Sequence, residues 1–142
     1  MTAAEFFQQV VKQNCLVARK NPKEYRHLWN AIVSMNTVAE YLALDGSGRT
    51  QMPGLELATR ANQIRDKTKH LSDLKECAEH LKHVRKIVDR KGGEFEIIGS
   101  STGHNLEDPT TWWAIRFNLK EIMEAALAEL EKLPELDPDP SC

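Results

Sequence analysis

The stretch YRHLWNAIVSMNTVAEYLAL, residues 25–44, decides the fold, because its apolar residues recur at steps of three and four. That spacing places them on one side of a helix. The apolar set is wide enough to be buried among several neighbours; it consists of Tyr25, Leu28, Trp29, Ile32, Val33, Met35, Val38, Ala39 and Leu42. Asn21 and Pro22 precede it as a cap and a first-turn residue. The sequence therefore predicts a long, buried helix that ends near Leu44.

Upstream of this stretch, the sequence predicts a shorter amphipathic helix. Thr2 and Glu5 have the spacing of a capping box, in which each side chain satisfies a backbone N–H group at a helix start. The apolar residues that follow recur at helical spacing; they are Phe6, Phe7, Val10, Val11 and Val17.

Downstream, the turn-forming segment DGSGRTQMPG, residues 45–54, predicts a loop. A weaker third helix follows, with an apolar set that consists of Leu57, Ala61, Ile64 and Leu71. Ser72 and Asp73 predict a break, after which a fourth helix is expected from about Leu74 to Asp89.

Two further elements complete the expected fold. The segment GEFEIIGSSTGHNL, residues 93–106, predicts a short β-hairpin or an extended arm. Asp108 and Pro109 then cap a last helix that runs from about Trp112 to Leu133. Amphipathic helices with short connections favour an all-α, antiparallel bundle of four to five helices. We expect one domain over residues 1–134 and a flexible, acidic, proline-rich tail over residues 135–142.

Composition excludes several classes of protein. The net charge of −2 gives no global attraction to nucleic acid or to an anionic membrane, and no apolar run is long enough to cross a bilayer. The three cysteines are too widely spaced for a CxxC pair and are expected to be reduced thiols; they are Cys15, Cys77 and Cys142. The N-terminus lacks the basic lead of a signal peptide. We therefore expect a cytoplasmic protein without a cofactor.

Charge is unevenly distributed along the chain. Residues 60–91 hold ten Lys or Arg against five Asp or Glu, whereas residues 107–142 hold three against nine. The basic middle and the acidic C-terminal part are expected to attract each other, either within the fold or between two copies. Amphipathic helices with ordinary solvated faces would show the same counts.

The segment DLKECAEHLKHVR, residues 73–85, is the richest in groups that could carry chemistry. On one continuous helix, Lys75, Lys82, His83 and Lys86 lie opposite the apolar stripe, and His80 lies on the flank. Such a face can hold phosphate groups by charge and can supply a proton carrier near neutral pH. The alternative is a solvated helix surface on which Glu79 and His83 form a weak pair.

The same segment carries a family resemblance. Lys75, Glu76, Ala78 and the Lys82-His83 pair are similar to the Arg-(Asp/Glu)-x-Ala-Asn-x-x-Lys-His signature of uncharacterised bacterial proteins with HEPN-like helical bundles. In this comparison Lys75 stands at the Arg position, and Glu79 stands at the Asn position. The order of elements between residues 25 and 133 also resembles that group. The resemblance implies a helical bundle, a homodimer and an RNA ligand.

Many HEPN domains are metal-independent ribonucleases that use an Arg and a His four to six residues apart, in a groove between two subunits. Arg65 and His70 have that spacing here, and Lys75 and His80 have it with Lys in place of Arg. The resemblance thus implies His83 and His80 as catalytic residues. The residues implied for nucleic-acid binding are Lys75, Lys82, Lys86, Arg85, Arg65 and His70.

Two smaller groups of residues allow other interpretations, a metal site and a surface for stacking nucleobases. Cys77, His80 and His83 follow one another at steps of three, but a helix spreads them too widely for zinc, and no metal is expected. Trp112 and Trp113 could stack on a nucleobase, although one core anchor and one edge residue are the more common arrangement.

The sequence leaves two functions open. The first is an HEPN-like protein that binds RNA, or cleaves it weakly without a metal. The second is a non-enzymatic helical module for protein–protein interaction, above all dimerisation through opposite charges. Neither function involves a membrane.

Overall fold

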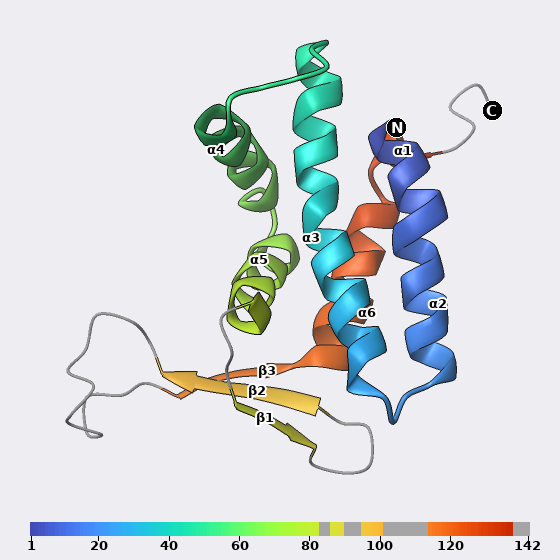
Figure 1. The fold of residues 1–142 in the computed structure, drawn as a ribbon, viewed down its shortest axis with the longest axis vertical. Helices are drawn as coiled ribbons and strands as arrows, with labels where there is room; N and C mark the ends of the chain where they lie inside the picture. The colour runs from blue at the N-terminus through green and yellow to red at the C-terminus, as the bar shows by residue number, and fades with distance from the viewer. Residues whose placement is uncertain (83–85, 90–94, 101–113, 138–142) are drawn as a thin grey trace.

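One long helix, α3 (Tyr25–Ser47), runs through the middle of the molecule, and every other helix packs against it (Figure 1). The structure is a computed structural model that describes residues 1–82, 86–89, 95–100 and 114–137. The helical bundle predicted from the sequence is confirmed. The helix α3 runs three residues beyond Leu44, and Gly48 ends it with a φ of 69°, a left-handed conformation that glycine adopts without strain.

The N-terminal helix is continuous but changes its winding. It consists of α1 (Ala3–Phe6), a π-helical turn η1 (Phe7–Val11) and α2 (Lys12–Lys20). The predicted cap is confirmed, since the Thr2 hydroxyl accepts a hydrogen bond of 3.1 Å from the backbone N–H of Glu5. Asn21 ends α2 instead of starting α3, because its side-chain amide donates to the carbonyl of Val17 at 2.9 Å.

The next two helices, α4 (Gly54–Arg65) and α5 (Lys69–Lys82), meet at a turn over residues 66–68, and α5 begins about five residues earlier than expected. The break predicted at Ser72 and Asp73 was wrong, because both residues lie within α5. The actual start of α5 is marked by Thr68, whose hydroxyl accepts a hydrogen bond of 3.2 Å from the N–H of Leu71.

A three-stranded antiparallel sheet closes one end of the bundle, in the order β1 (Lys86–Asp89), β2 (Phe95–Ser100), β3 (Ala114–Asn118). The extended segment predicted before the last helix is therefore present as β2. The predicted continuation of the fourth helix to Asp89 was wrong. Ile87 lies opposite Ile97 in the ladder, and β-branched residues favour such a pleated position.

The last helix, α6 (Leu119–Glu131), starts about seven residues later than predicted, since Ala114–Asn118 pairs with β2 as strand β3. Asn118 caps α6 by accepting a hydrogen bond of 3.1 Å from the N–H of Glu121. Trp112 and Trp113 lie outside the described residues.

The core lies between α3 and the other helices. Its largest side chains that are almost fully buried are Phe7, Ile32, Met35, Leu74, Leu119 and Met123. The expected tail boundary at residue 135 was wrong, because a short 3-10 helix, η3 (Pro134–Leu136), returns Leu136 to this core at 2% exposure. The carbonyl of Leu136 also accepts a hydrogen bond of 3.3 Å from the side chain of Gln8. The part of the tail at 138–142 lies outside the described residues.

Candidate interaction surface

The predicted phosphate-binding face on α5 is only partly assembled. Lys75 and Lys82, seven residues apart, share one edge of the helix, with Lys75 half-buried and Lys82 exposed. The exposed Glu76 and Glu79 belong to the same outward side. This side of α5 is therefore mixed in charge, because two carboxylates accompany the two lysines.

Two other residues expected on that face do not belong to it. Lys86 opens strand β1, so it cannot continue the helical row of Lys82. His80 is half-buried at another edge, with its ring 5.9 Å from the ring of Phe117 on β3. His83 and Arg85 lie outside the described residues.

Arg65 is a core residue and not a surface cation, which corrects the expectation that it contacts nucleic acid. It is 7% exposed, and it donates hydrogen bonds to the backbone carbonyl of Asn36 at 2.6 Å and to the side chain of Asn62 at 2.9 Å. Burial lowers the pKa of its guanidinium, and the charge of Glu40, 3.5 Å away, opposes that shift. His70, by contrast, is exposed near the start of α5, so the two do not form a shared site.

Two thiols are also core groups. Cys15 and Cys77 are at most 1% exposed, and burial raises the pKa of Cys15 to about 11 and that of Cys77 to about 12. A thiol that stays protonated is a poor nucleophile and a poor metal ligand. Within the described residues, no group of three His, Cys, Asp or Glu side chains could hold a metal ion.

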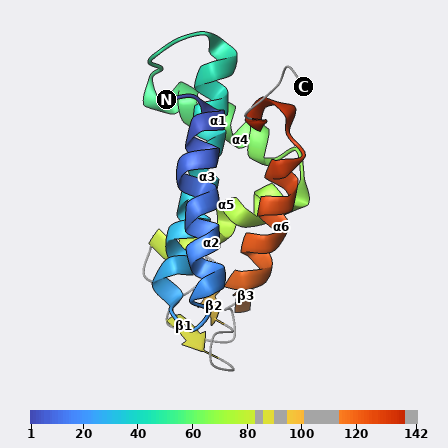
Figure 2. The same cartoon turned by 90° about the vertical axis from the view of Figure 1, so that its right-hand side faces the viewer.

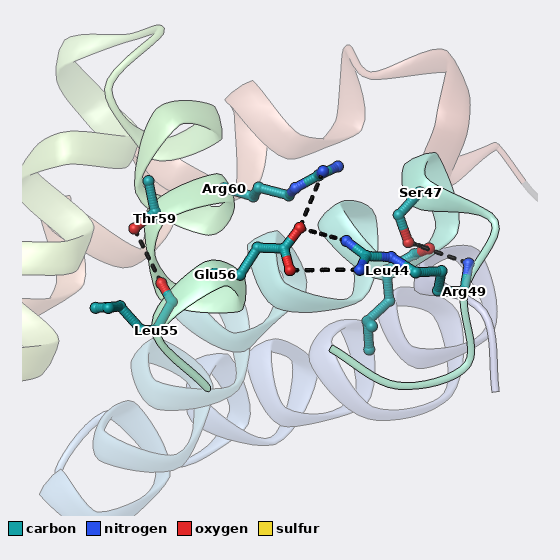
Figure 3. A network of polar contacts seen from close by, with 7 residues as sticks. All are labelled: Leu44, Ser47, Arg49, Leu55, Glu56, Thr59 and Arg60. Carbon is teal, nitrogen blue, oxygen red and sulfur yellow. Dashed lines mark hydrogen bonds and ion pairs between the residues drawn. The ribbon is translucent and has the colours of Figure 1, made fainter. Parts of the chain in front are cut away.

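A polar network fixes the connection from α3 to α4 (Figure 3). Glu56 on α4 forms an ion pair with Arg49, which follows α3, and a second ion pair of 3.1 Å with Arg60. The hydrogen bond from Arg49 lowers the pKa of the Glu56 carboxyl. Leu55, beside this network, is 83% exposed, but a single exposed leucine is common on protein surfaces.

A partly exposed apolar surface lies along the seam between the N-terminal helix and α3. We call it the α2–α3 face. Its residues on α3 follow one another at steps of four and are all half-buried, and each step advances about 40° around the helix, so the row winds across the outward side of α3; they are Trp29, Val33, the polar Thr37 and Tyr41. Its residues on the N-terminal helix are half-buried or exposed; they are Phe6, Val10 and Val17.

Two contacts align these rows. The rings of Phe6 and Tyr41 stack with centroids 4.5 Å apart, and the Asn14 amide donates to the Ser34 hydroxyl at 3.2 Å. The two helices are therefore antiparallel neighbours over the length of the face. Figures 1 and 2 show α6 on the side of α3 that faces away from this surface, and the pair α4–α5 on the flank of α3 away from α2. No described element therefore covers the remaining side of α3, which we call its outward side.

The two ends of the α2–α3 face differ in charge. Near the turn between α2 and α3, the exposed charged residues are mainly basic; they are Lys20, Lys23, Glu24 and Arg26. At the other end Glu5, Glu40 and Asp45 carry negative charge; Glu40 also lies 3.5 Å from Arg65, and the cation Arg49 follows α3. This surface was missed in the sequence because its apolar residues were assigned to the core. The four-residue spacing of Trp29, Val33, Thr37 and Tyr41 was the available signal.

Comparison of the chain with family models, with curated proteins and with solved structures found no match. Among the described helices, none is both long enough and apolar enough to cross a bilayer.

Proposed function

We propose that this chain is a non-enzymatic helical interaction module that forms a homodimer through the α2–α3 face. The observation that carries the proposal is the outward side of α3, where Trp29, Val33 and Tyr41 keep part of their apolar surface exposed, although Trp29 and Tyr41 also pack against the core. Residues at steps of four form a ridge on a helix surface, and such ridges pack into the grooves of another helix pair.

The charges favour a second copy as the partner. A two-fold axis through the middle of the face would make the two protomers antiparallel. The basic end of one copy, with Lys20 and Arg26, would then meet the acidic end of the other, with Glu5 and Asp45. Opposite charges at the rim of an interface set its register and accelerate association.

The size of the face also suits a dimer. The 23 residues of α3 span about 35 Å at 1.5 Å per residue. A face two helices wide, roughly 20 Å, and as long as the whole of α3 with the charged ends included, is then on the order of 700 Å² per protomer. A typical stable interface buries about 800 Å² per partner.

Sedimentation equilibrium tests the proposal. Val33→Glu places a charge in the middle of the face and is expected to make the protein monomeric. The matched control is Leu55→Glu, which adds the same charge at an exposed leucine on α4 and should leave the dimer intact. Circular dichroism then tests whether both variants keep the helical fold.

A second variant tests the dimer even if Val33→Glu does not fold. Arg26 is an exposed residue, so Arg26→Glu should leave the fold unchanged and weaken the dimer about two- to fivefold, and less at high salt. A wild-type protein that is monomeric at several hundred micromolar would refute the proposal. So would equal dimerisation of the wild type and Val33→Glu.

RNA binding by an HEPN-like protein is the second proposal, and the shared edge of Lys75 and Lys82 on α5 favours it. The double variant Lys75→Glu, Lys82→Glu should abolish salt-sensitive RNA binding, whereas Lys120→Glu, Lys132→Glu on α6 should not. If cleavage occurs, His80→Ala or His83→Ala should remove it and leave binding. Absence of RNA binding at low salt would exclude this second function.

A further inference from the structure

A cavity of about 410 Å³ lies beside the C-terminal half of α3. It forms because α5 packs against both α3 and α6, whereas α4 packs mainly against α3. The cavity is lined by the C-terminal part of α3, by the turn between α4 and α5, and by the end of α6. Its apolar walls are Leu42, Ile64, Leu71 and Leu133.

The rim of this cavity is acidic. Asp45, Glu129 and Glu135 line it, with Lys67 as the single cation among its lining residues. A neighbouring cavity of about 510 Å³ shares Asp45 and Glu135 and adds the carboxylate of Glu5. One carboxylate is already engaged, since Asp45 accepts a hydrogen bond of 2.8 Å from the N–H of Ala3. Glu129 also lies 3.5 Å from Lys132, so Glu135 is the rim carboxylate best suited to meet a ligand.

We propose that this cavity binds a small organic amine, with an apolar body against the leucine and isoleucine walls and its ammonium group at the rim. The volume lies in the range of small-molecule sites, which are mainly apolar and carry a few polar groups for orientation. A carboxylate or phosphate ligand would meet like charges at Asp45 and Glu135. A small hydrated cation would leave the apolar walls unused.

Three probe ligands separate these contributions in isothermal titration calorimetry on the wild-type chain. The probe 4-phenylbutylamine has both the apolar body and the charge, and it should bind saturably. The probe 4-phenylbutanoate keeps the body and reverses the charge. Methylamine keeps the charge without the body. Each of the last two should bind at least about tenfold more weakly, since one like-charge contact or one lost apolar body is worth about 1.4 kcal/mol or more.

Two variants locate the site. Glu135→Gln should weaken binding of 4-phenylbutylamine about two- to fivefold, the range of a partly exposed ion pair. The control Glu131→Gln, at the last residue of α6 and outside this cavity, should leave binding unchanged. Ile64→Trp should fill the cavity and abolish binding; if that variant does not fold, Leu133→Trp takes its place.

Several results would overturn the inference. These are equal affinity for the amine and the carboxylate, unchanged binding in the filled variant, and no amine binding at millimolar concentration. Binding of an oligolysine peptide without binding of 4-phenylbutylamine would also overturn it, because it would assign the rim to a basic protein segment. Asp45 belongs both to this rim and to the acidic end of the α2–α3 face, but none of the variants used here lies on that face, so this test and that of the dimer can fail separately.

Discussion

Replacement of Arg65 separates two roles that this buried cation could have. Its stem fills space between α3 and α4, and its guanidinium ties the end of α4 to the backbone of α3 through the carbonyl of Asn36. Its Nε and the side-chain oxygen of Asn36 are both buried without a hydrogen-bond partner in the structure. The cation is thus only partly compensated for its loss of water.

The expected magnitudes follow from that geometry. Arg65→Met keeps most of the stem, loses charge-assisted hydrogen bonds of about 1.5–3 kcal/mol each, and avoids a desolvation cost of several kcal/mol. These terms nearly cancel, so the free energy of unfolding should change by less than about 1 kcal/mol. Arg65→Ala also removes two buried methylene groups, at about 0.8 kcal/mol each, and leaves a cavity. It should cost about 2–4 kcal/mol.

Urea unfolding followed by circular dichroism measures both values, and thermal melts provide a check. A loss of about 3 kcal/mol in a chain of this size lowers the melting temperature by about 6–12 °C. If Arg65→Met costs as much as Arg65→Ala, the reasoning is refuted, because the charge and its hydrogen bonds would then hold α4 in place and the stem would not.

Three further outcomes are expected from the buried thiols and from one surface ion pair. In a Cys142→Ser background, Ellman's reagent at pH 8 should react with no thiol of the folded protein and with two after unfolding, because Cys15 and Cys77 stay protonated in the core. Burial raises the pKa of both thiols above the ordinary value of 9.0, so their contribution to stability should be complete below pH 9 and be lost as pH rises through about 11 to 12. Replacing both by alanine should flatten that decline. Arg19 lowers the pKa of the Glu124 carboxyl, so this ion pair should stabilise the fold above pH 4.5 and lose its effect as the pH falls further. Both side chains are more than a third exposed, and solvent therefore weakens the pair. Glu124→Gln should accordingly lower the free energy of unfolding by less than about 1 kcal/mol.

The helices with continuous apolar stripes and the extended segment that forms β2 were predictable, whereas the strands β1 and β3 were not. The stripe from Tyr25 onward and the cap at Thr2 are local signals, and the structure confirms both. Val88 and Ile115 also fit the helical spacing of their neighbours, yet both lie in strands. Pairing of Val88 with Glu96, and of Ile115 with Gly99, joins distant segments, and periodicity in a short window cannot anticipate it.

The predicted phosphate-binding residues and the α2–α3 face show the same limit of local sequence patterns. The sequence identified Lys75 and Lys82 on one helix edge, but it extended the helix through Lys86, which the chain places in a strand. It also counted Arg65 as a surface cation, because charge alone does not reveal that a neighbouring helix supplies a carbonyl acceptor. Some residues of α3 that look like core in the sequence, such as Val33, are half-buried, because no element among the described residues lies over the outward side of that helix.

The π-helical turn η1 (Phe7–Val11) should allow the N-terminal helix to lose one residue without losing its packing against α3. Ala3, Phe7, Val11 and Cys15 recur at every fourth residue and all are at most 1% exposed. In an α-helix that repeat would drift by about 40° per step and leave the core, whereas steps of four and three in alternation stay in line. A turn closed by i→i+5 bonds absorbs the surplus residue. Deletion of the exposed Gln9 would therefore yield an ordinary heptad repeat, with both ends of the helix still seated on α3.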